Sequence, residues 1–290
     1  MKKMMTLVLA LVALTCNSFA QSIYFKAGGG YAIPIASQSI GEKYHYKQDY
    51  TNANNPISKQ TAENVSGSFG AGANFNVGAG YMFNEYIGVE LNAQYTLGKK
   101  IETSNIETYT TGSYSSSTEH IIQHYSRGIY LNPSFILTTA RGSKIPYGRF
   151  GLVVGSQKIM KDSTYTYTDG FYNSTGTGKG EYSGGISLGF QGAVGINWML
   201  SDKIDLFTEV NFISMTYYAE EYEVTEYNSN GYDYLPELSV SQKKTVFKKE
   251  IELGESQNPD KPREELREGS AFSSLSLQVG IRFLLNGHGM

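Results

Sequence analysis

Two histidines stand four residues apart in the segment Glu119-His120-Ile121-Ile122-Gln123-His124. On a helix, side chains at this spacing share a face, so the pair could hold one zinc ion. The residue after His120 is isoleucine, however, where the H-E-x-x-H zinc motif has glutamate. On a strand the two side chains would lie roughly 13 Å apart, too far for one metal ion. We therefore expect no metal site here.

A glycine-rich segment, Gly176-Thr177-Gly178-Lys179-Gly180, is superficially similar to a phosphate-binding loop. The phosphate-binding motif requires glycine where this chain has Asn173, and Ser or Thr after the lysine, where it has Gly180. The segment is therefore predicted to be a flexible loop tip, and no cofactor site is expected.

The first twenty residues have the pattern of a cleaved secretory signal. Lys2 and Lys3 precede an apolar stretch, and Ser18-Phe19-Ala20 is a small-x-small cleavage site. The single cysteine, Cys16, lies inside this segment, so no disulfide or cysteine metal site is expected in the processed chain. A lipoprotein signal acylated at Cys16 is the less favoured alternative, because the residue before it is not Gly or Ala.

The charge balance is slightly acidic. The chain carries 24 Lys and Arg against 27 Asp and Glu, a net charge of −3, and loss of Lys2 and Lys3 with the signal lowers it to −5. A nucleic-acid-binding protein needs clustered positive charge, so no nucleic-acid partner is expected.

Strand periodicity runs through much of the remaining sequence. From Phe69 to Phe83 every second residue is apolar, and the residues between them are mostly Gly or Asn. Because side chains of a strand alternate between its faces, this run is predicted to be one long strand with an apolar side. The turn pair Asn84-Glu85 separates it from a second alternating run, which indicates a hairpin. The eight predicted strands are Ile23–Ile35, Phe69–Phe83, Ile87–Leu97, Tyr125–Leu137, Ile145–Ser156, Ile186–Leu200, Ile204–Met215 and Ser273–Leu285.

Short and long connections alternate between these strands. Short links follow the second, fourth and sixth strands. The long links are residues 36–67, 98–124, 157–183 and 216–269, with 32, 27, 27 and 54 residues. An even number of antiparallel strands with short turns at one end and long loops at the other is typical of outer-membrane barrels.

The two faces of the strands decide between a membrane barrel and a soluble one. A soluble barrel turns its apolar face inward and presents Lys and Glu to water. Here the second face is mostly Gly, Ser, Asn and Gln, which suits the crowded interior of an eight-stranded barrel. The apolar face carries no charged residue in the predicted strands, where one charge at mid-bilayer would cost roughly 2–4 kcal/mol. The pattern therefore favours a membrane barrel.

The chain resembles the eight-stranded outer-membrane β-barrel family typified by the OmpA transmembrane domain and the OmpX-like proteins. The resemblance rests on the opening segment from Tyr24 to Tyr31, the hairpin from Gly80 to Leu91, and the closing strand from Leu275 to Phe283. It covers the processed chain in pattern, and no single motif is diagnostic. It implies both termini in the periplasm and four loops exposed outside the cell.

Charged side chains on the second face form the one predicted site. Three positive and three negative groups in a narrow interior should pair, because an unpaired buried charge is costly. The favoured interpretation is a polar plug that closes the barrel to solutes, and the alternative is a gated ion path in which the pairs exchange partners. The six residues are Lys26, Glu90, Arg149, Asp205, Glu209 and Arg282.

One sequence feature raises a catalytic alternative. His124-Tyr125-Ser126 is weakly similar to the His-x-Ser pair of outer-membrane lipid A deacylases. Such a site must face lipid, whereas the odd-numbered residues form the apolar set of this strand and turn His124 and Ser126 inward. No matching acid is apparent downstream, so no catalytic residue is predicted.

The sequence thus predicts an all-β protein, an eight-stranded antiparallel transmembrane up-and-down β-barrel with four long extracellular loops. Residues 1–20 are the signal peptide and residues 21–290 the barrel domain. The expected function is that of a non-catalytic outer-membrane surface protein, structural or binding through its Tyr-rich loops, which suit recognition or form a hydrophilic brush. The alternatives are a narrow porin-like channel and, less favoured, a lipid-modifying enzyme. Expected partners are outer-membrane lipid, lipopolysaccharide and an extracellular ligand.

Overall fold

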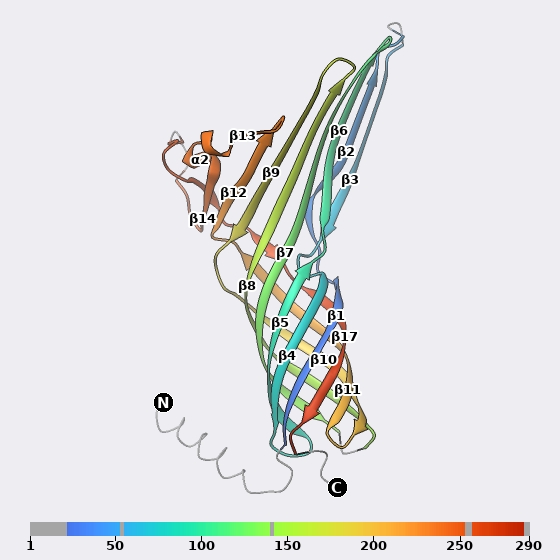
Figure 1. Ribbon diagram of the computed structural model, residues 1–290, viewed down its shortest axis with the longest axis vertical. Coiled ribbons are helices and arrows are strands. Elements are labelled where there is room, and N and C mark those ends of the chain that lie inside the picture. The colour runs from blue at the N-terminus through green and yellow to red at the C-terminus, as the bar shows by residue number, and fades with distance from the viewer. Residues whose placement is uncertain (1–21, 53–54, 140–141, 253–256, 287–290) are drawn as a thin grey trace.

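The computed structural model describes residues 22–52, 55–139, 142–252 and 257–286 (Figure 1). Within these ranges the chain has seventeen strands and only two short helices, η2 (Leu235–Glu237) and α2 (Val240–Lys243). Neither helix is long and apolar enough to cross a bilayer. The prediction of β-structure is confirmed, whereas the prediction of eight strands is wrong for the chain as a whole. The predicted signal at residues 1–20 lies outside the described residues.

Eight of the strands pair in a closed ring, here called the ring. Each is antiparallel to both of its neighbours, and the last pairs with the first. In order around the ring they are β1 (Ser22–Pro34), β4 (Gly72–Met82), β5 (Ile87–Gly98), β7 (Tyr114–Thr138), β8 (Lys144–Asp169), β10 (Ser187–Ser201), β11 (Ile204–Tyr218) and β17 (Ser274–Leu284). Six of the predicted strands begin and end within three residues of β1, β4, β5, β10, β11 and β17.

The other two ring strands are much longer than predicted. β7 and β8 continue past the ring, where they join further strands in a tall open sheet (Figure 1), here called the wall. Besides the upper parts of β7 and β8, its strands are β2 (Gln38–Asp49), β3 (Ile57–Gly67), β6 (Ile101–Thr111), β9 (Asn173–Ser183), β12 (Glu221–Ser229), β13 (Tyr232–Asp233), β14 (Lys244–Lys248) and β15 (Arg263–Leu266). A last short strand, β16 (Gly269–Ala271), pairs with the top of β11.

The four long links are therefore mostly β-structure, and their prediction as loops is wrong. Two wall pairings, β2 with β6 and β14 with β15, are parallel, whereas every pairing within the ring is antiparallel. Several wall strands contain Thr and Tyr, which favour extended backbone, but they lack the apolar face that marks a strand in sequence.

The prediction for the start of β4 is also wrong. Phe69 and Ala71 were expected on the outer apolar face, but both are buried. The strand begins only at Gly72, whose φ of +140° favours glycine and whose Cβ, if present, would lie 2.1 Å from the Leu97 carbonyl oxygen. The backbone amide of Ala71 donates to the carbonyl of Ser68, and this turn folds Phe69 over the end of the ring interior.

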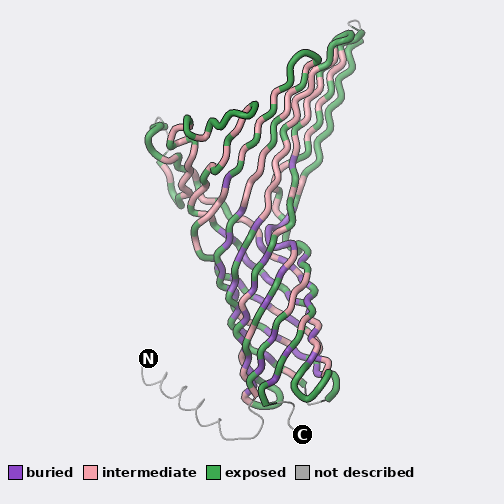
Figure 2. The backbone as a smooth tube through the Cα atoms, in the orientation of Figure 1, coloured by how far each residue is buried: buried purple, intermediate pink, exposed green. Residues whose placement is uncertain are grey.

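Ring and wall differ in burial (Figure 2). Along the ring strands buried and exposed residues alternate, whereas the wall is mostly intermediate and exposed. The exposed ring positions are large and apolar, for example Val77, Leu131 and Phe135. The buried ring positions are mainly polar, for example Asn92 and Gln278. The ring is thus apolar outside and polar inside.

Candidate functional site

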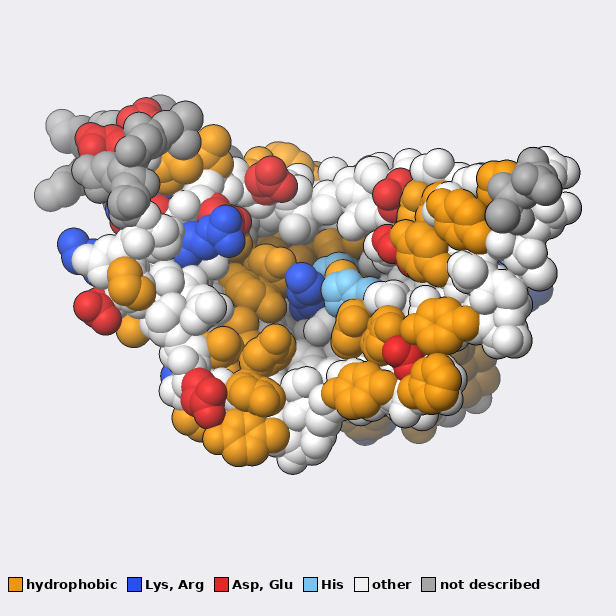
Figure 3. Space-filling view, turned by 90° about the horizontal axis from the view of Figure 1, so that it is seen from above, with side chains coloured by type: hydrophobic (Ala, Val, Ile, Leu, Met, Phe, Trp, Pro, Cys, Tyr) orange, Lys and Arg blue, Asp and Glu red, His pale blue; other side chains and the backbone are white. Residues whose placement is uncertain are grey.

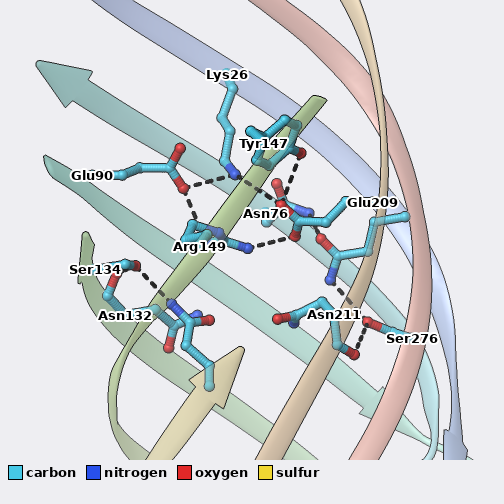
Figure 4. A network of polar contacts seen from close by, with 12 residues as sticks. Lys26, Asn76, Glu90, Asn132, Ser134, Tyr147, Arg149, Glu209, Asn211 and Ser276 are labelled. Atoms are coloured by element: carbon cyan, nitrogen blue, oxygen red, sulfur yellow. Dashed lines mark hydrogen bonds and ion pairs between the residues drawn. The ribbon is translucent and has the colours of Figure 1, made fainter. Parts of the chain in front are cut away.

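Four of the six predicted interior charges meet in one network (Figure 4). Lys26 Nζ lies 2.7 Å from Glu90 Oε1, and Arg149 Nη1 lies 2.9 Å from the same oxygen. Arg149 Nη2 lies 2.5 Å from Glu209 Oε1. The four side chains come from β1, β5, β8 and β11, which are every second strand around the ring, so the network crosses the interior from all sides.

Two tyrosines complete this charge network. The Tyr24 hydroxyl donates to Glu90 Oε2 at 2.8 Å, and the Tyr147 hydroxyl donates to Glu209 Oε2 at 2.9 Å. Each carboxylate therefore has cationic and phenolic donors, which offset the cost of removing its charge from water. Two positive and two negative groups leave the network formally neutral.

The remaining two predicted charges form a separate pair. Arg282 on β17 donates to Asp205 Oδ2 of neighbouring β11 through Nε at 2.8 Å and through Nη2 at 2.5 Å. Arg282 Cζ also lies 5.1 Å from the centre of the Tyr24 ring, which connects this pair to the charge network. All six residues are at most 6% exposed. The structure thus places all six inside the ring, in two groups rather than one.

Below and around these charges, at the end with the short turns, the interior is apolar. This lower apolar cluster is formed by residues at the short-turn ends of five ring strands. They are Tyr24, Met82, Ile136, Tyr147 and Leu284.

Toward the wall, the charge network is followed by a layer of side-chain amides. Asn76 donates to Gln278, Gln278 donates to Asn74, and Gln191 donates to Ser134 Oγ. Among the described residues, the side-chain amide atoms of Asn92, Asn132 and Asn211 are buried with no protein partner. Such groups need hydrogen bonds, which water molecules inside the ring can supply.

At the wall end the interior becomes apolar again. Phe69 and Phe272 lie across it with ring centres 5.8 Å apart, and Tyr217 meets Phe272 edge-on at 5.7 Å. This upper apolar cluster was not predicted, although Ile213, Met215 and Tyr217 fall in phase with Glu209 on the interior face of β11. Its residues are Phe69, Tyr130, Val153, Ile159, Ile213, Met215, Tyr217 and Phe272.

A cavity of about 430 Å³ lies above the upper apolar cluster, lined by residues of β2, β7, β8 and β9 and of the segment from β14 to β16; we call it the mouth cavity. This volume is in the range of small-molecule sites. Seen from the wall side, hydrophobic side chains lie in the central hollow of the molecule together with His and Lys or Arg side chains (Figure 3). The cavity is lined by Gln38, Ser39, Ile40, Phe69, His124, Ile159, Tyr182, Ala219, Phe247, Glu265, Leu266, Glu268 and Ser270.

His124 and Ser126 face the interior, where each has different surroundings. The Ser126 hydroxyl is buried and donates to the Phe69 carbonyl oxygen at 2.6 Å. His124 lines the mouth cavity, and its Nδ1 is buried with no partner in the described part of the chain. Burial, with a smaller effect of Lys161, lowers the pKa of His124 to about 4, so its imidazole is neutral at physiological pH.

The two other sequence motifs lie in the wall. His120 pairs with Asn105 on β6 and Tyr165 on β8, and no group of three or more His, Cys, Asp or Glu arranged for a metal ion occurs among the described residues. The segment from Gly176 to Gly180 belongs to β9 and pairs with β8 and β12, so its prediction as a loop tip is wrong.

No protein-family model matches this chain, and no curated protein matches its sequence. Its fold is similar to outer membrane protein OprG from Pseudomonas aeruginosa, with a TM-score of 0.42 and 9% identity over 92% of this chain and 96% of that one. Neisserial surface protein A (NspA) gives 0.35 and 11% over 91% and 99%. The outer membrane protease OmpT from Escherichia coli gives 0.27 and 7% over 93% and 100%. All three are outer-membrane β-barrel proteins, the class that the sequence pattern resembles.

Proposed function

We propose that the ring is an eight-stranded transmembrane barrel in the outer membrane and that the wall stands outside the cell as a binding surface. The observation that carries this proposal is the polarity of the ring. Its exposed face presents Val77 at 60% and Leu131 at 50% exposure, while Glu90 and Arg149 are buried. In water this arrangement would leave a large apolar surface exposed. In a bilayer the apolar face contacts lipid, and the polar face is enclosed within the ring.

The upper boundary of the proposed membrane segment follows from the outer face of β7 and β8. Arg127 and Lys158 are register partners, and both are exposed. On β7 the outward positions below Arg127 are apolar, from Ile129 to Leu137. This length matches the roughly 9–11 residues that a tilted strand needs to cross the hydrocarbon.

A closed interior supports a non-catalytic binding protein over a channel. The charge network crosses the interior, and the upper apolar cluster closes it again at the wall end. A solute would have to break buried ion pairs and separate packed aromatic rings to pass. The buried Ser126 hydroxyl, which donates to a backbone carbonyl, weighs against the lipid-modifying alternative.

One observation favours the channel as a second candidate. The amide layer between the two closures contains buried polar atoms without protein partners, so we expect water in this part of the interior. A conducting state would then require only that the closures open.

Conductance across planar bilayers tests the closed interior. We expect no steady current from the intact protein. Steady currents that disappear in the variants Arg149→Gln and Glu90→Gln would contradict the proposal and establish the channel, because both variants alter the charge network without touching the wall.

Protease treatment of intact cells tests the topology. We expect cleavage only in the wall, for instance after Lys47 or Lys59, which lie on β2 and β3. Cleavage at the short turn after Ser201, in cells with an intact outer membrane, would contradict it.

The structure of lipid A extracted from cells that overproduce the protein tests the non-catalytic role. We expect unchanged lipid A, and a changed structure would contradict this role.

A further inference from the structure

The mouth cavity has an aromatic side. Tyr182 of β9 stacks against Phe247 of β14, with ring centres 6.0 Å apart and planes at 19°. Tyr222 of β12 also contacts Tyr182, with ring centres 4.5 Å apart and planes at 41°. Tyr182 and Phe247 both line the cavity. Aromatic faces carry negative partial charge, so this side attracts cations as well as apolar groups.

The cavity also has an acidic side. Glu265 and Glu268 line it, and among its described lining residues none is Lys or Arg. Glu265 is paired with Arg263 at 3.1 Å, and Glu268 is exposed. Lys161 on β8 is the register partner of His124 and stands two residues after Ile159, and both His124 and Ile159 line the cavity. Its positive charge directs a bound cation away from β7 and β8 and toward β15.

The cavity is closed at its floor, on the side toward the ring interior. Phe69 and Ile159 belong both to its lining and to the upper apolar cluster, in which Phe272 and Tyr217 are at most 1% exposed. A ligand that enters from outside would therefore rest on an apolar floor and be held there rather than passed into the ring. The neutral imidazole of His124, whose Nδ1 has no partner among the described residues, adds one hydrogen-bonding group on the floor side.

We propose that the mouth cavity is a binding site for a small organic cation, an amine with an apolar or aromatic body. The body packs on Phe69, Ile159 and the Tyr182–Phe247 pair, and the ammonium group lies toward Glu265 and Glu268. This inference deepens the proposed binding function and depends on it, because the cavity must open outside the cell.

The test uses two probes with the same ring system and opposite charge, tryptamine and indole-3-propionate. Their binding to the full processed chain in nanodiscs of zwitterionic lipid is measured by calorimetry, with empty nanodiscs as the blank. We expect saturable one-to-one binding of tryptamine and at least about tenfold weaker binding of the anion, since two partly exposed carboxylates and an aromatic face each favour the cation modestly.

Two variants locate the site. The double substitution Glu265→Gln with Glu268→Gln keeps the shape of the side chains and should weaken tryptamine binding about tenfold. Glu264→Gln is the matched control, because Glu264 neighbours Glu265 on β15 but pairs with Lys248 outside the cavity. We expect the control to bind tryptamine as the unchanged protein does. Tyr182→Leu, which removes the aromatic face, should weaken binding of both probes.

Equal binding of the two probes, or unchanged tryptamine binding in the double variant, would overturn the proposal. Each variant is first checked for the heat-sensitive electrophoretic mobility of a folded barrel, so that loss of binding is not loss of fold. Failure here would leave the protease and conductance results intact, whereas failure of those experiments would remove the proposed function itself.

Discussion

β7 and β8 belong to both regions of the molecule, and the same two strands obey different rules in each. Below Arg127 and Lys158 buried and exposed residues alternate; the exposed ones are mostly apolar, and the buried ones include polar residues, glycine and members of the two apolar clusters. Above these residues most positions are half-buried or exposed, and neither face is continuously apolar. The backbone pairing continues without a break through this change.

The difference separates two sources of strand stability. In the ring, side chains must match two environments, so the pattern is strict and can be read from the sequence. In the wall, backbone hydrogen bonds, cross-strand pairs such as Tyr46 with Tyr109, and surface ion pairs hold the sheet. We expect substitutions to cost much more in the ring than in the wall, and the following predictions test that contrast.

The largest expected effect is at Arg149. In the variant Arg149→Met, Lys26 is the one described cation within 4 Å of Glu90 and Glu209, at 2.7 and 3.9 Å. Removal of one partner from a buried ion pair typically costs about 3–5 kcal/mol of the free energy of unfolding. Urea unfolding of protein inserted in lipid vesicles measures this loss. The wall control, Lys179→Met, breaks the exposed pair with Glu226 and should cost less than about 1 kcal/mol. Equal losses would refute the contrast.

The outer face gives the next largest effect. Leu131→Arg places a charge on the exposed apolar face of the ring and should cost about 2–4 kcal/mol in lipid. Ser115→Arg lies on the same strand but in the wall, where it is exposed, and should change stability by less than about 0.5 kcal/mol. The same vesicle assay compares the two. If Leu131→Arg were tolerated as well as Ser115→Arg, the ring would not face lipid.

A smaller effect is expected from glycine on the inner face. In Gly155→Ala the new methyl group would lie 2.2 Å from the Tyr130 ring, which must move, so we expect a loss of about 1–3 kcal/mol. Gly192 is on the outer face, where a methyl group would meet nothing within 4 Å. Gly192→Ala should therefore be neutral within about 0.5 kcal/mol, and melting curves of both variants decide the matter.

The smallest effect concerns pH and His124 at the junction of ring and wall. Its pKa is about 4 in the folded protein, below the ordinary 6.5, so folding favours the neutral imidazole. This contribution is fully present above pH 6.5 and is lost as the pH falls from 6.5 toward 4. NMR titration of the imidazole should show a neutral ring at pH 5. In His124→Gln the loss of stability between pH 7 and pH 5 should be smaller, and an unchanged loss would exclude His124 as its source.

The ring could be predicted from sequence because its two faces differ so strongly. Alternation from Tyr24 to Ile33 or from Leu275 to Phe283 places each side chain on one side, and the six interior charges follow from phase alone. The wall could not be predicted in this way. Segments such as Ile101–Thr111 carry polar residues on both faces, so a loop and a strand have nearly the same sequence pattern.

The mouth cavity lay beyond sequence reasoning for a different reason. Its lining comes from segments far apart in the chain, for example Phe69, Phe247 and Leu266, whose approach depends on how the wall folds over the ring. The upper apolar cluster gave a partial signal in Ile213, Met215 and Tyr217. Phe272 and Phe69 lie outside the regular strands, so no sequence signal indicated that they contribute to this cluster.

The unbroken run of β7 and β8 also has a mechanical consequence. Both strands pair with ring neighbours at one end, β5 and β10, and reach the far end of the wall at the other, near Asp169. A pull at that far end, as from an attached particle, would act along the strands and load their hydrogen bonds to β5 and β10 together in shear. The protein would then resist extension as one stiff unit anchored in the ring, and its strands would not unfold one after another under tension.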